Sequence, residues 1–390
     1  MSRNTTNYPA VVIPAFNRPK SFLRLLRSLE IGNYPINNSI ELIISIDGGG
    51  DYEVLQIAKE FNWKFGTKTI IEHRENLGLK NHIIYCGDLT EKYGSIILLE
   101  DDLVASRDYY IYAYKALEFF SDEINVGQIS LYAYDRLEDS LMRFYPLKGD
   151  SDCYFIQWAS SWGQAWSMDQ WKEFKNWYKK NENKKSIFAA LPSFIKSWGE
   201  HSWKKFFISY LVSSNKYTVF PYHSLTSPSG AAGVNHNEYS LPMHQSSLCT
   251  GVNRQYNFKK FQASFLKYDV YFEPEKALID GITQKFINYN FECDFYGTKN
   301  FEKIESEYLF SIRNCTNPIH SFDCKVFPLE LNLLLGSGSK ISFGKKCDFN
   351  KRFTMREKLA SYLFLQKLFN PIEAIFYNSL KILYKLLGKL

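Results

Sequence analysis

The sequence has little that would mark a secreted, disulfide-bonded or membrane-spanning protein. Its seven cysteines are scattered, odd in number and without a CxxC pair, which argues against a disulfide framework and against a zinc site. No apolar run approaches the roughly 20 residues that a membrane span requires. The N-terminal stretch MSRNTTNYPAVVIP also lacks the basic and apolar regions of a secretory signal. We therefore expect a cytoplasmic protein.

An excess of charge of one sign is confined to one end of the chain. The formal net charge is +6, and residues 351–390 hold eight basic and two acidic residues, so the rest of the chain sums to zero. A nucleic-acid-binding protein would spread its basic excess over a folded face, so we expect no nucleic-acid partner. Apolar residues, by contrast, are abundant: 45% of the chain is hydrophobic and 17% aromatic, enough for a sizeable core.

Short apolar runs alternate with amphipathic stretches in the first third of the chain. The runs typical of buried strands are AVVIP (10–14), IELIISI (40–46), TKTIIEH (67–73) and SIILL (95–99). In the stretch 19–30 between the first two, apolar residues recur with helical spacing. Continuous apolar strands that alternate with helices predict a doubly wound α/β domain with a mostly parallel sheet flanked by helices.

Polar residues follow each predicted strand, where such sheets bind their ligands. Asn17 and Arg18 follow the first strand, Asp47 the second, Asn76 the third, and the triplet Glu100-Asp101-Asp102 the fourth. Because the carboxyl ends of parallel strands meet at one edge, we expect these side chains to converge there.

The negative charge of the triplet at 100–102 must be offset by a cation or by hydrogen-bond donors, because three adjacent carboxylates repel one another and raise each other's pKa. A divalent metal held by one or two carboxylates and by substrate phosphates would supply it. Alternatively, an acid such as Asp108 favours the start of the following helix, with Ser106 as its cap. That alternative explains one acid but not three.

Six motifs in order resemble the nucleotide-binding half of GT-A glycosyltransferases. They are VVIPAFNRP, SIDGG, HRENLGLKNH, LLEDDLVAS, SWGQAW and WGEHSW, spread over roughly residues 8–240. The likeness is to the inverting group that includes N-acetylglucosaminyltransferase I and bacterial surface-polysaccharide enzymes of the family 2 type, with E-D-D as the DxD-type motif.

The resemblance implies a role for each matching residue. Arg18 and Asp47 would contact the nucleotide base, Asp101 the ribose or donor sugar, and Asp102 a divalent metal, Mn²⁺ or Mg²⁺. The full set implied for nucleotide-sugar binding is Pro14, Asn17, Arg18, Asp47, Asn76, Gly78, Lys80, Glu100, Asp101, Trp162, Gly163 and His236.

Two further segments have competing interpretations. Trp158, Trp162 and Trp166 recur every fourth residue and either pack in the core or line a pocket, where Trp162 or Trp166 would stack on a sugar. Residues 226–237, TSPSGAAGVNHN, suit a mobile loop that closes on the diphosphate, with His236 either in the site or on the surface.

Inverting transfer needs a base that removes the proton of the attacking hydroxyl. Our candidate is Glu200, in the acidic position of WGEHSW, where relatives usually carry aspartate; His201 and Asp169 are the runners-up. The alternative for Glu200 is a surface acid on a helix that continues through KKFFISYLV.

We predict a catalytic domain over 1–250, an accessory region of unknown role over 251–350, and a basic tail of two amphipathic helices over 351–390. Basic amphipathic helices bind anionic membranes, so the tail would bring the enzyme to the inner face of a membrane. It would otherwise pack on its own domain or on a partner subunit.

The predicted activity is metal-dependent, inverting transfer of a sugar from a nucleotide-diphosphate donor to a glycan or lipid-linked acceptor, in surface polysaccharide synthesis. A nucleotidyltransferase is the alternative enzyme, but PAFNRPKS lacks the glycine-rich phosphate loop expected of one. A non-catalytic carbohydrate-binding protein is the other alternative, and it would have no need of the acidic triplet.

Overall fold

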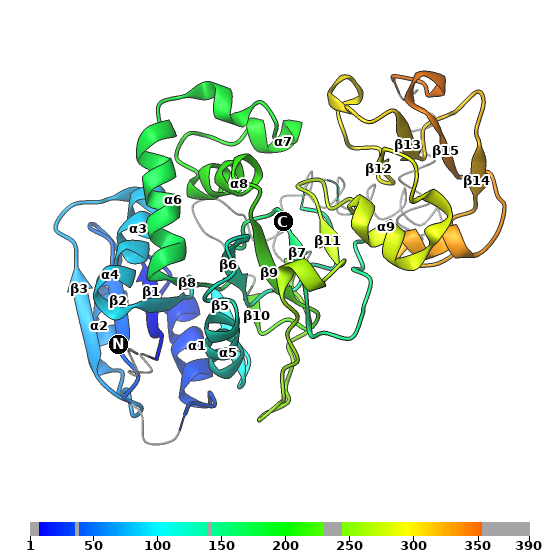
Figure 1. Ribbon diagram of the computed structural model, residues 1–390. Helices are drawn as coiled ribbons and strands as arrows, with labels where there is room; N and C mark the ends of the chain where they lie inside the picture. Colours follow the sequence, from blue (N-terminus) through cyan, green and yellow to red (C-terminus); the bar gives the residue numbers. More distant parts are fainter. Residues whose placement is uncertain (1–7, 36–38, 139, 141, 230–243, 353–390) are drawn as a thin grey trace, which may run out of the picture. The chain divides into compact units, whose positions relative to one another are not determined.

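The computed structural model describes residues 8–35, 39–138, 140, 142–229 and 244–352 (Figure 1). Contacts divide the chain into unit 1, residues 1–134 and 146–281, and unit 2, residues 135–145 and 282–390. The predicted tail helices and His236 lie outside the described residues. Within the described ranges we found no helix with the length and apolar character of a membrane span.

Unit 1 is built on a nine-stranded sheet with the strand order β11-β7-β9-β6-β8-β4-β1-β2-β3. The strands are β1 (Ala10–Ala15), β2 (Leu42–Ile46), β3 (Lys68–Glu72), β4 (Ser95–Leu98), β6 (Val126–Ser130), β7 (Cys153–Ile156), β8 (Gln164–Ser167), β9 (Tyr217–Pro221) and β11 (Lys267–Tyr268). The first four confirm the strands predicted from the apolar runs.

The first four strands pair in parallel, so their carboxyl ends share one edge. Strand β8 reverses this direction and pairs antiparallel with both β4 and β6. Beside this edge, β5 (Leu103–Ala105) pairs antiparallel with β10 (Thr226–Pro228). The sheet is therefore mostly parallel on the side of the predicted site and mixed beyond it.

Helices cover both faces of the sheet (Figure 1). Helices α1 (Pro19–Glu30), α2 (Tyr52–Glu60) and α5 (Tyr109–Phe119) pack on one face. The other face carries α3 (Gly78–Asp88), α4 (Thr90–Tyr93), α6 (Met168–Asn181) and α8 (Trp203–Ser213), with the short α7 (Ser193–Lys196) and α9 (Lys276–Ile282) elsewhere in the chain. This arrangement confirms the predicted α/β class, a mostly parallel sheet flanked by helices.

The helix ends follow from local sequence. Pro19 occupies the first position of α1, where its missing amide proton costs nothing, and Phe22, Leu25, Leu26 and Leu29 are fully buried against the sheet. Asp51 caps α2 by accepting a hydrogen bond from the amide of Glu53 at 2.9 Å.

The start of α5 differs from expectation. Ser106 does not cap the helix, and its hydroxyl is buried without a hydrogen-bond partner among the described residues. Asp108 is fully buried and accepts hydrogen bonds from the amides of Asn253 and Arg254 and from the Tyr256 hydroxyl. Because these partners lie about 145 residues away in sequence, Asp108 anchors a distant segment rather than its own helix.

The tryptophan-rich segment does not form one helix. It runs from β7 through a loop to β8 and then into α6, so the four-residue spacing of the tryptophans does not place them on one helical face. Trp158 and Trp166 are fully buried, whereas Trp162 is half-buried. Core packing therefore accounts for Trp158 and Trp166 but not for Trp162.

The predicted boundary near residue 250 does not coincide with a break between the units. Residues 251–281 pack with unit 1, where β11 pairs in parallel with β7. A catalytic role for the first segment and an accessory role for 251–350 stay predictions.

Unit 2 contains a four-stranded sheet, in the order β12-β13-β15-β14, that sequence analysis left unclassified. Its strands are β12 (Phe291–Asp294), β13 (Tyr308–Ser311), β14 (His320–Phe322) and β15 (Ile341–Lys345). Aromatic rings form much of its interior: the Phe310 and Phe343 ring centroids are 4.4 Å apart, and Phe286 packs against both.

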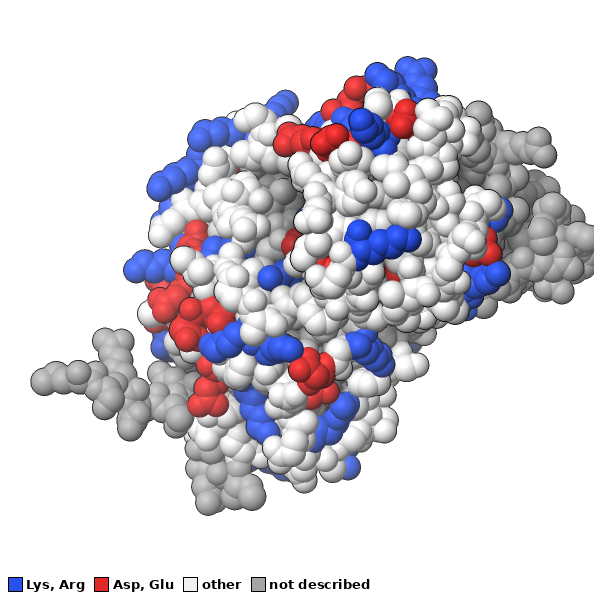
Figure 2. All heavy atoms as spheres, turned by 45° about the vertical axis from the view of Figure 1, so that its right-hand side comes forward, with Lys and Arg blue, Asp and Glu red and all other residues white. Residues whose placement is uncertain are grey.

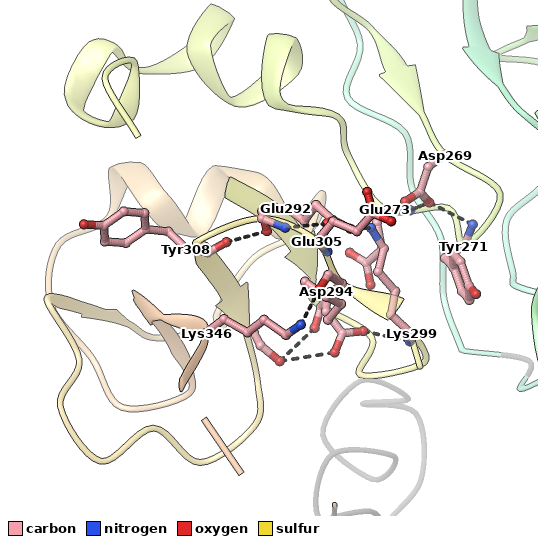
Figure 3. A network of polar contacts seen from close by, with 12 residues as sticks. Asp269, Tyr271, Glu273, Glu292, Asp294, Lys299, Glu305, Tyr308 and Lys346 are labelled. Carbon is pink, nitrogen blue, oxygen red and sulfur yellow. Dashed lines mark hydrogen bonds and ion pairs between the residues drawn. The ribbon is translucent and has the colours of Figure 1, made fainter. Parts of the chain in front are cut away.

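Ion pairs and hydrogen bonds link the strands and loops of unit 2. The Arg313 Nε donates to Asp294 Oδ2 at 2.8 Å, and both side chains are almost completely buried. The Asp294 carboxylate also accepts from the backbone amide of Lys299, whose ammonium pairs with Glu292 at 3.3 Å (Figure 3). Glu292 in turn accepts from the amide of Glu305 at 2.9 Å.

Charged side chains of both signs are interspersed on the face shown in Figure 2. Exposed pairs such as Lys59–Glu72, 3.6 Å apart, belong to this kind of surface. Such pairs contribute about 0–1 kcal/mol each, because water and salt screen them.

Replacing Asp294 with asparagine leaves the Arg313 guanidinium buried without its counter-ion, which costs about 3–5 kcal/mol. We expect Asp294→Asn to accelerate hydrogen–deuterium exchange over residues 291–311 by more than tenfold. Glu72→Gln breaks the exposed pair with Lys59 and should leave exchange nearly unchanged. Wild-type exchange rates across 291–311 in Asp294→Asn would contradict a stabilising role for the buried pair.

Candidate active site

A cavity of about 240 Å³ lies at the carboxyl ends of β1, β2 and β4. Eight of the residues that the sequence predicted for nucleotide-sugar binding line it: Pro14, Asn17, Arg18, Asp47, Asn76, Gly78, Glu100 and Asp101. Ala15, Phe16, Leu79 and His82 complete the lining. The predicted convergence of strand-end residues is therefore confirmed.

The acidic triplet is held by Arg18, which begins the turn into α1. The Arg18 Nη1 lies 3.0 Å from Asp101 Oδ1 and 2.6 Å from Asp102 Oδ2. The backbone amide of Phe16 donates to Asp101 Oδ2 at 3.2 Å. Arg18, predicted to contact the nucleotide base, is thus also the protein cation that offsets the crowded carboxylates.

The compensation by Arg18 is incomplete. Burial, followed by the negative charge of Asp102, raises the pKa of Glu100 to about 8. Burial raises the pKa of Asp101 to about 6 although Arg18 opposes the rise. Asp102 Oδ1 is buried and has no hydrogen-bond partner within the part of the chain that the structure describes. A buried carboxylate oxygen of this kind is suited to bind a cation.

Asp47 accepts three hydrogen bonds from backbone amides. Its Oδ1 accepts from the amides of Gly48 at 2.9 Å and Leu77 at 2.7 Å, and its Oδ2 accepts from the amide of Gly78 at 3.1 Å. The carboxylate therefore ties the end of β2 to the start of α3. Contact of Asp47 with a nucleotide base stays a prediction.

Glycines at the cavity permit a close backbone approach. A Cβ on Gly48 would lie 2.3 Å from the carbonyl carbon of Glu75, so the two loops could not meet at this separation with a larger residue. Gly78 has φ +70°, a conformation that residues with a Cβ rarely adopt. Asn76 closes the contact by donating from Nδ2 to the carbonyl of Gly48 at 3.1 Å.

Trp162 and Gly163 lie near the triplet because β8 is antiparallel to β4. Gln164 pairs with Leu98, two residues before Glu100, so the residues that precede β8 come to the carboxyl end of β4. Gly163 has φ +93°, and a Cβ there would lie 2.7 Å from Thr226 Oγ1. Lys80 points elsewhere, with its ammonium 5.3 Å from the centre of the Phe206 ring of α8.

The candidate bases occupy three different environments. Glu200 and His201 are exposed in the loop before α8, which begins only at Trp203, so Glu200 is not on a helix surface. Asp169 lies in the first turn of α6, next to the beginning of β4, where the amide of Met168 donates to the carbonyl of Gly94. Asp169 is thus at the opposite edge of the sheet from the cavity.

The loop predicted to close on the diphosphate starts at the site. Its first residues form β10, and the amide of Ser229 donates to the carbonyl of Asp102 at 2.7 Å. Residues 230–243, and with them His236, are outside the described ranges.

Sequence reasoning missed His82, whose imidazole lines the cavity. His82 Nε2 is 2.8 Å from Ser45 Oγ, and the same hydroxyl is 2.9 Å from His73 Nε2. Burial lowers the pKa of His82 to about 4. The signal was present, since the HRENLGLKNH motif begins with His73 and ends with His82, but only the fold shows that the two histidines share the Ser45 hydroxyl.

The lowered pKa of His82 predicts a pH dependence of folding. The neutral imidazole is favoured in the folded state, so its contribution is complete above pH 6.5 and is lost as the pH falls toward 4. Between these values the unfolding free energy of the wild type should fall by about 2–3 kcal/mol more than that of His82→Gln. Urea denaturation at each pH measures this, with exposed His201→Gln as the control that behaves like wild type. Equal slopes for wild type and His82→Gln would contradict the prediction.

Comparison with known proteins gives a family match over part of the chain and no match among curated proteins. The family model described as glycosyl transferase family 2 matches residues 10–187, somewhat under half of the chain. A search of curated proteins gave no significant match.

Solved structures of glycosyltransferases are similar at low identity. A mannosyltransferase from Pyrobaculum calidifontis, in complex with GDP-Man and Mn²⁺, is 12% identical with a TM-score of 0.32 over 44% of this chain and 46% of that chain. TarS of S. aureus with UDP is 14% identical with a TM-score of 0.37 over 56% and 59%. GalNAc-T7 with UDP, GalNAc and Mn²⁺ is 13% identical with a TM-score of 0.38 over 56% and 43%.

The chain thus spans about half of the length of these structures. The sheet, the cavity at its carboxyl edge and the family match agree with the resemblance carried by the motifs. Residues 10–187 match the glycosyl transferase family 2 model, and they contain the sheet edge and most of the cavity-lining residues described above.

Proposed function

We propose that this protein is a metal-dependent, inverting glycosyltransferase that moves a sugar from a nucleotide-diphosphate donor to a hydroxyl group. The observation that carries the proposal is the cavity at the carboxyl ends of β1, β2 and β4, which gathers eight predicted donor-site residues, two of them members of the acidic triplet. The family 2 match over residues 10–187 supports the same activity.

The cavity is the proposed nucleotide site. Polar side chains from three strand ends, Asn17, Asp47 and Asn76, line it together with the backbone of β1. Asp47 holds the 76–78 turn through backbone amides, so that turn is fixed before a ligand arrives. A preformed, partly polar cavity of this kind binds a ligand without the cost of ordering its walls.

Asp102 is the proposed metal ligand, because its Oδ1 is a buried carboxylate oxygen without a hydrogen-bond partner in the described ranges. Within those ranges no group of three or more His, Cys, Asp or Glu residues is arranged to hold a metal. We propose that the diphosphate of the donor completes the coordination, as is usual for Mn²⁺ or Mg²⁺ bound through one or two carboxylates. When bound, the ion offsets negative charge on the leaving diphosphate.

The chain's own groups carry the remaining steps. Arg18 bridges Asp101 and Asp102 and so fixes both carboxylates at the edge of the cavity. Glu200 is the proposed general base that takes the proton of the acceptor hydroxyl. Its exposed loop precedes α8, whose first turn reaches Trp162 through Lys204, 5.2 Å from the ring centre.

The acceptor and the place of action remain part of the proposal. We propose a glycan or lipid-linked acceptor in surface polysaccharide synthesis, at the inner face of a membrane that the basic 351–390 segment would contact. That segment carries eight basic and two acidic residues, and most of it lies outside the described ranges.

Asp102→Asn tests the metal and the activity together. We expect Mn²⁺-dependent transfer or hydrolysis, screened over a panel of nucleotide sugars, to fall at least roughly 100-fold. Thermal stabilisation by Mn²⁺ plus nucleoside diphosphate should also be lost, since it requires the ligand to bind the folded state.

The matched control is Asp169→Asn, an acid at the opposite edge of the sheet, which should behave as wild type. Full activity in Asp102→Asn would remove Asp102 from the metal site. Binding without turnover by the wild type, with every donor and acceptor, would favour a carbohydrate-binding protein instead.

Glu200→Gln tests the base. Loss of general-base catalysis should lower kcat by about 10²–10⁴-fold while leaving the affinity for nucleoside diphosphate unchanged. His201→Gln, the neighbouring runner-up, should retain most activity. Near-normal turnover in a folded Glu200→Gln protein would exclude Glu200, and loss of turnover in His201→Gln alone would transfer the role to His201.

A further inference from the structure

Lys205, in the first turn of α8, is a buried lysine whose ammonium binds the loop that carries Glu200. The residue is only 5% exposed. Its Nζ donates to the carbonyl oxygens of Lys196 at 2.9 Å and Trp198 at 2.7 Å. It also lies 4.4 Å from the centre of the Phe188 ring. The charged end of the side chain therefore binds the backbone that directly precedes Glu200.

The backbone of Lys205 closes the other end of the same loop. Its amide donates to the hydroxyl of Ser202, the N-terminal cap of α8, at 3.3 Å. Within the loop, the amide of Ser202 donates to the carbonyl of Gly199 at 3.2 Å. Because the ammonium binds residue 198 and the amide binds residue 202, Lys205 holds the chain on both sides of Glu200.

Buried aromatic rings anchor the two ends of the loop. The Trp198 ring packs against the fully buried Trp158, with ring centroids 6.3 Å apart. Trp203, which is also buried, packs against Trp166 with centroids 6.0 Å apart. Glu200 is exposed between these two anchors. A short segment held at both ends has few conformations to lose, so its side chains stay close to one place.

The loop lies on the side of the nucleotide cavity. The Lys80 ammonium is 5.3 Å from the centre of the Phe206 ring, so the first turns of α3 and α8 are neighbours. Gly78, the first residue of α3, lines the cavity. Strand β9, which follows α8, runs in the same direction as β6 and β4. Since α8 leads back to the start of β9, the helix begins at the carboxyl edge of the sheet.

Packing alone does not favour a lysine at this position. A buried ammonium loses its hydration, which costs free energy unless other oxygen atoms replace the water. Here two carbonyl oxygens do so, and both belong to the chain just before Glu200. Burial lowers the pKa of Lys205 and the negative charge of Glu200 opposes that change, so the two charges lie near each other. The interactions that offset the cost of burial are thus those that hold the candidate base.

We propose that Lys205 is a positioning residue for the transfer reaction, which holds the 198–202 loop so that the Glu200 carboxylate stays in place for the acceptor hydroxyl. Lys205 acts through Glu200 and touches neither donor nor acceptor. The inference rests on the proposed function, because it takes Glu200 to be the general base. A base must lie within hydrogen-bond reach of the proton that it removes, so a loosened loop slows the chemical step and leaves donor binding unchanged.

Substitutions of Lys205 and a matched control test this role. Lys205→Met keeps the apolar stem of the side chain but removes the charge and the donors, whereas Lys205→Arg keeps both. The control is Lys68→Met, since the Lys68 ammonium also donates to backbone carbonyls, those of Ala58 at 2.7 Å and Lys59 at 2.9 Å. Lys68 begins β3 and so lies at the edge opposite to the cavity. Glu200→Gln, alone and combined with Lys205→Met, completes a double-mutant cycle.

Turnover is measured with the sugar nucleotide that gives the highest Mn²⁺-dependent rate in the panel. We expect Lys205→Met to lower kcat at least tenfold at an unchanged affinity for UDP or GDP, whichever binds the wild type, and Lys205→Arg to restore most of the rate. In the Glu200→Gln background the further loss should be less than twofold, because the base that Lys205 positions is already absent. Hydrogen–deuterium exchange over 198–202 should be at least tenfold faster in Lys205→Met. Lys68→Met should match the wild type in kcat and in exchange over 198–202.

Wild-type kcat in Lys205→Met, with Glu200→Gln impaired, would overturn the inference and leave the proposed base intact. Equal losses from Lys205→Met in the wild-type and Glu200→Gln backgrounds would also contradict it, since the effect would not pass through Glu200. Unchanged exchange over 198–202 in Lys205→Met would refute the holding of the loop, whatever the turnover. Near-normal turnover in Glu200→Gln, or no transfer by the wild type with any donor and acceptor, would instead reject the proposed function and this inference with it.

Discussion

The candidate site depends on one electrostatic requirement. The negative charges of Glu100, Asp101 and Asp102, which are adjacent at the end of β4, must be offset by nearby positive charge or hydrogen-bond donors. Adjacent carboxylates are stable only where positive charge or hydrogen-bond donors reach them. Arg18 reaches two of them from the turn after β1, and the amide of Phe16 supplies a further donor. The parallel pairing of β1 with β4 places these groups together, so the sheet topology itself makes the triplet possible.

The walls around the triplet are made rigid by backbone contacts. Asp47 accepts three amide protons and joins β2 to the start of α3, and Gly48 allows the loops to approach without a clash. On the other side, the reversal of β8 brings Trp162 to the same edge, and Lys204 of α8 lies over the Trp162 ring.

Unit 2 uses a different means of stabilisation. Its small sheet buries aromatic rings such as Phe310 and Phe343, and the Asp294–Arg313 pair joins β12 to the segment that follows β13. A buried ion pair is specific but gives little net stability, since desolvation offsets most of the attraction. The apolar rings therefore supply most of the stabilisation, whereas loss of one partner of the pair is costly because it leaves the other charge buried alone.

The sequence by itself determined the four parallel strands, the helix begun by Pro19 and the convergence of strand-end residues. These features follow from the spacing of apolar residues along the chain. That spacing can be read locally, without knowing which strands or helices pack together. Tertiary structure decided the rest: that Asp108 anchors residues 253–256, that Asp47 binds backbone amides, that Asp169 lies at the opposite edge of the sheet, and that Lys204 lies over the Trp162 ring. Each of these contacts depends on strand direction or on a partner tens of residues away in the sequence. The residues that surround a side chain in space are not specified by its neighbours in the sequence.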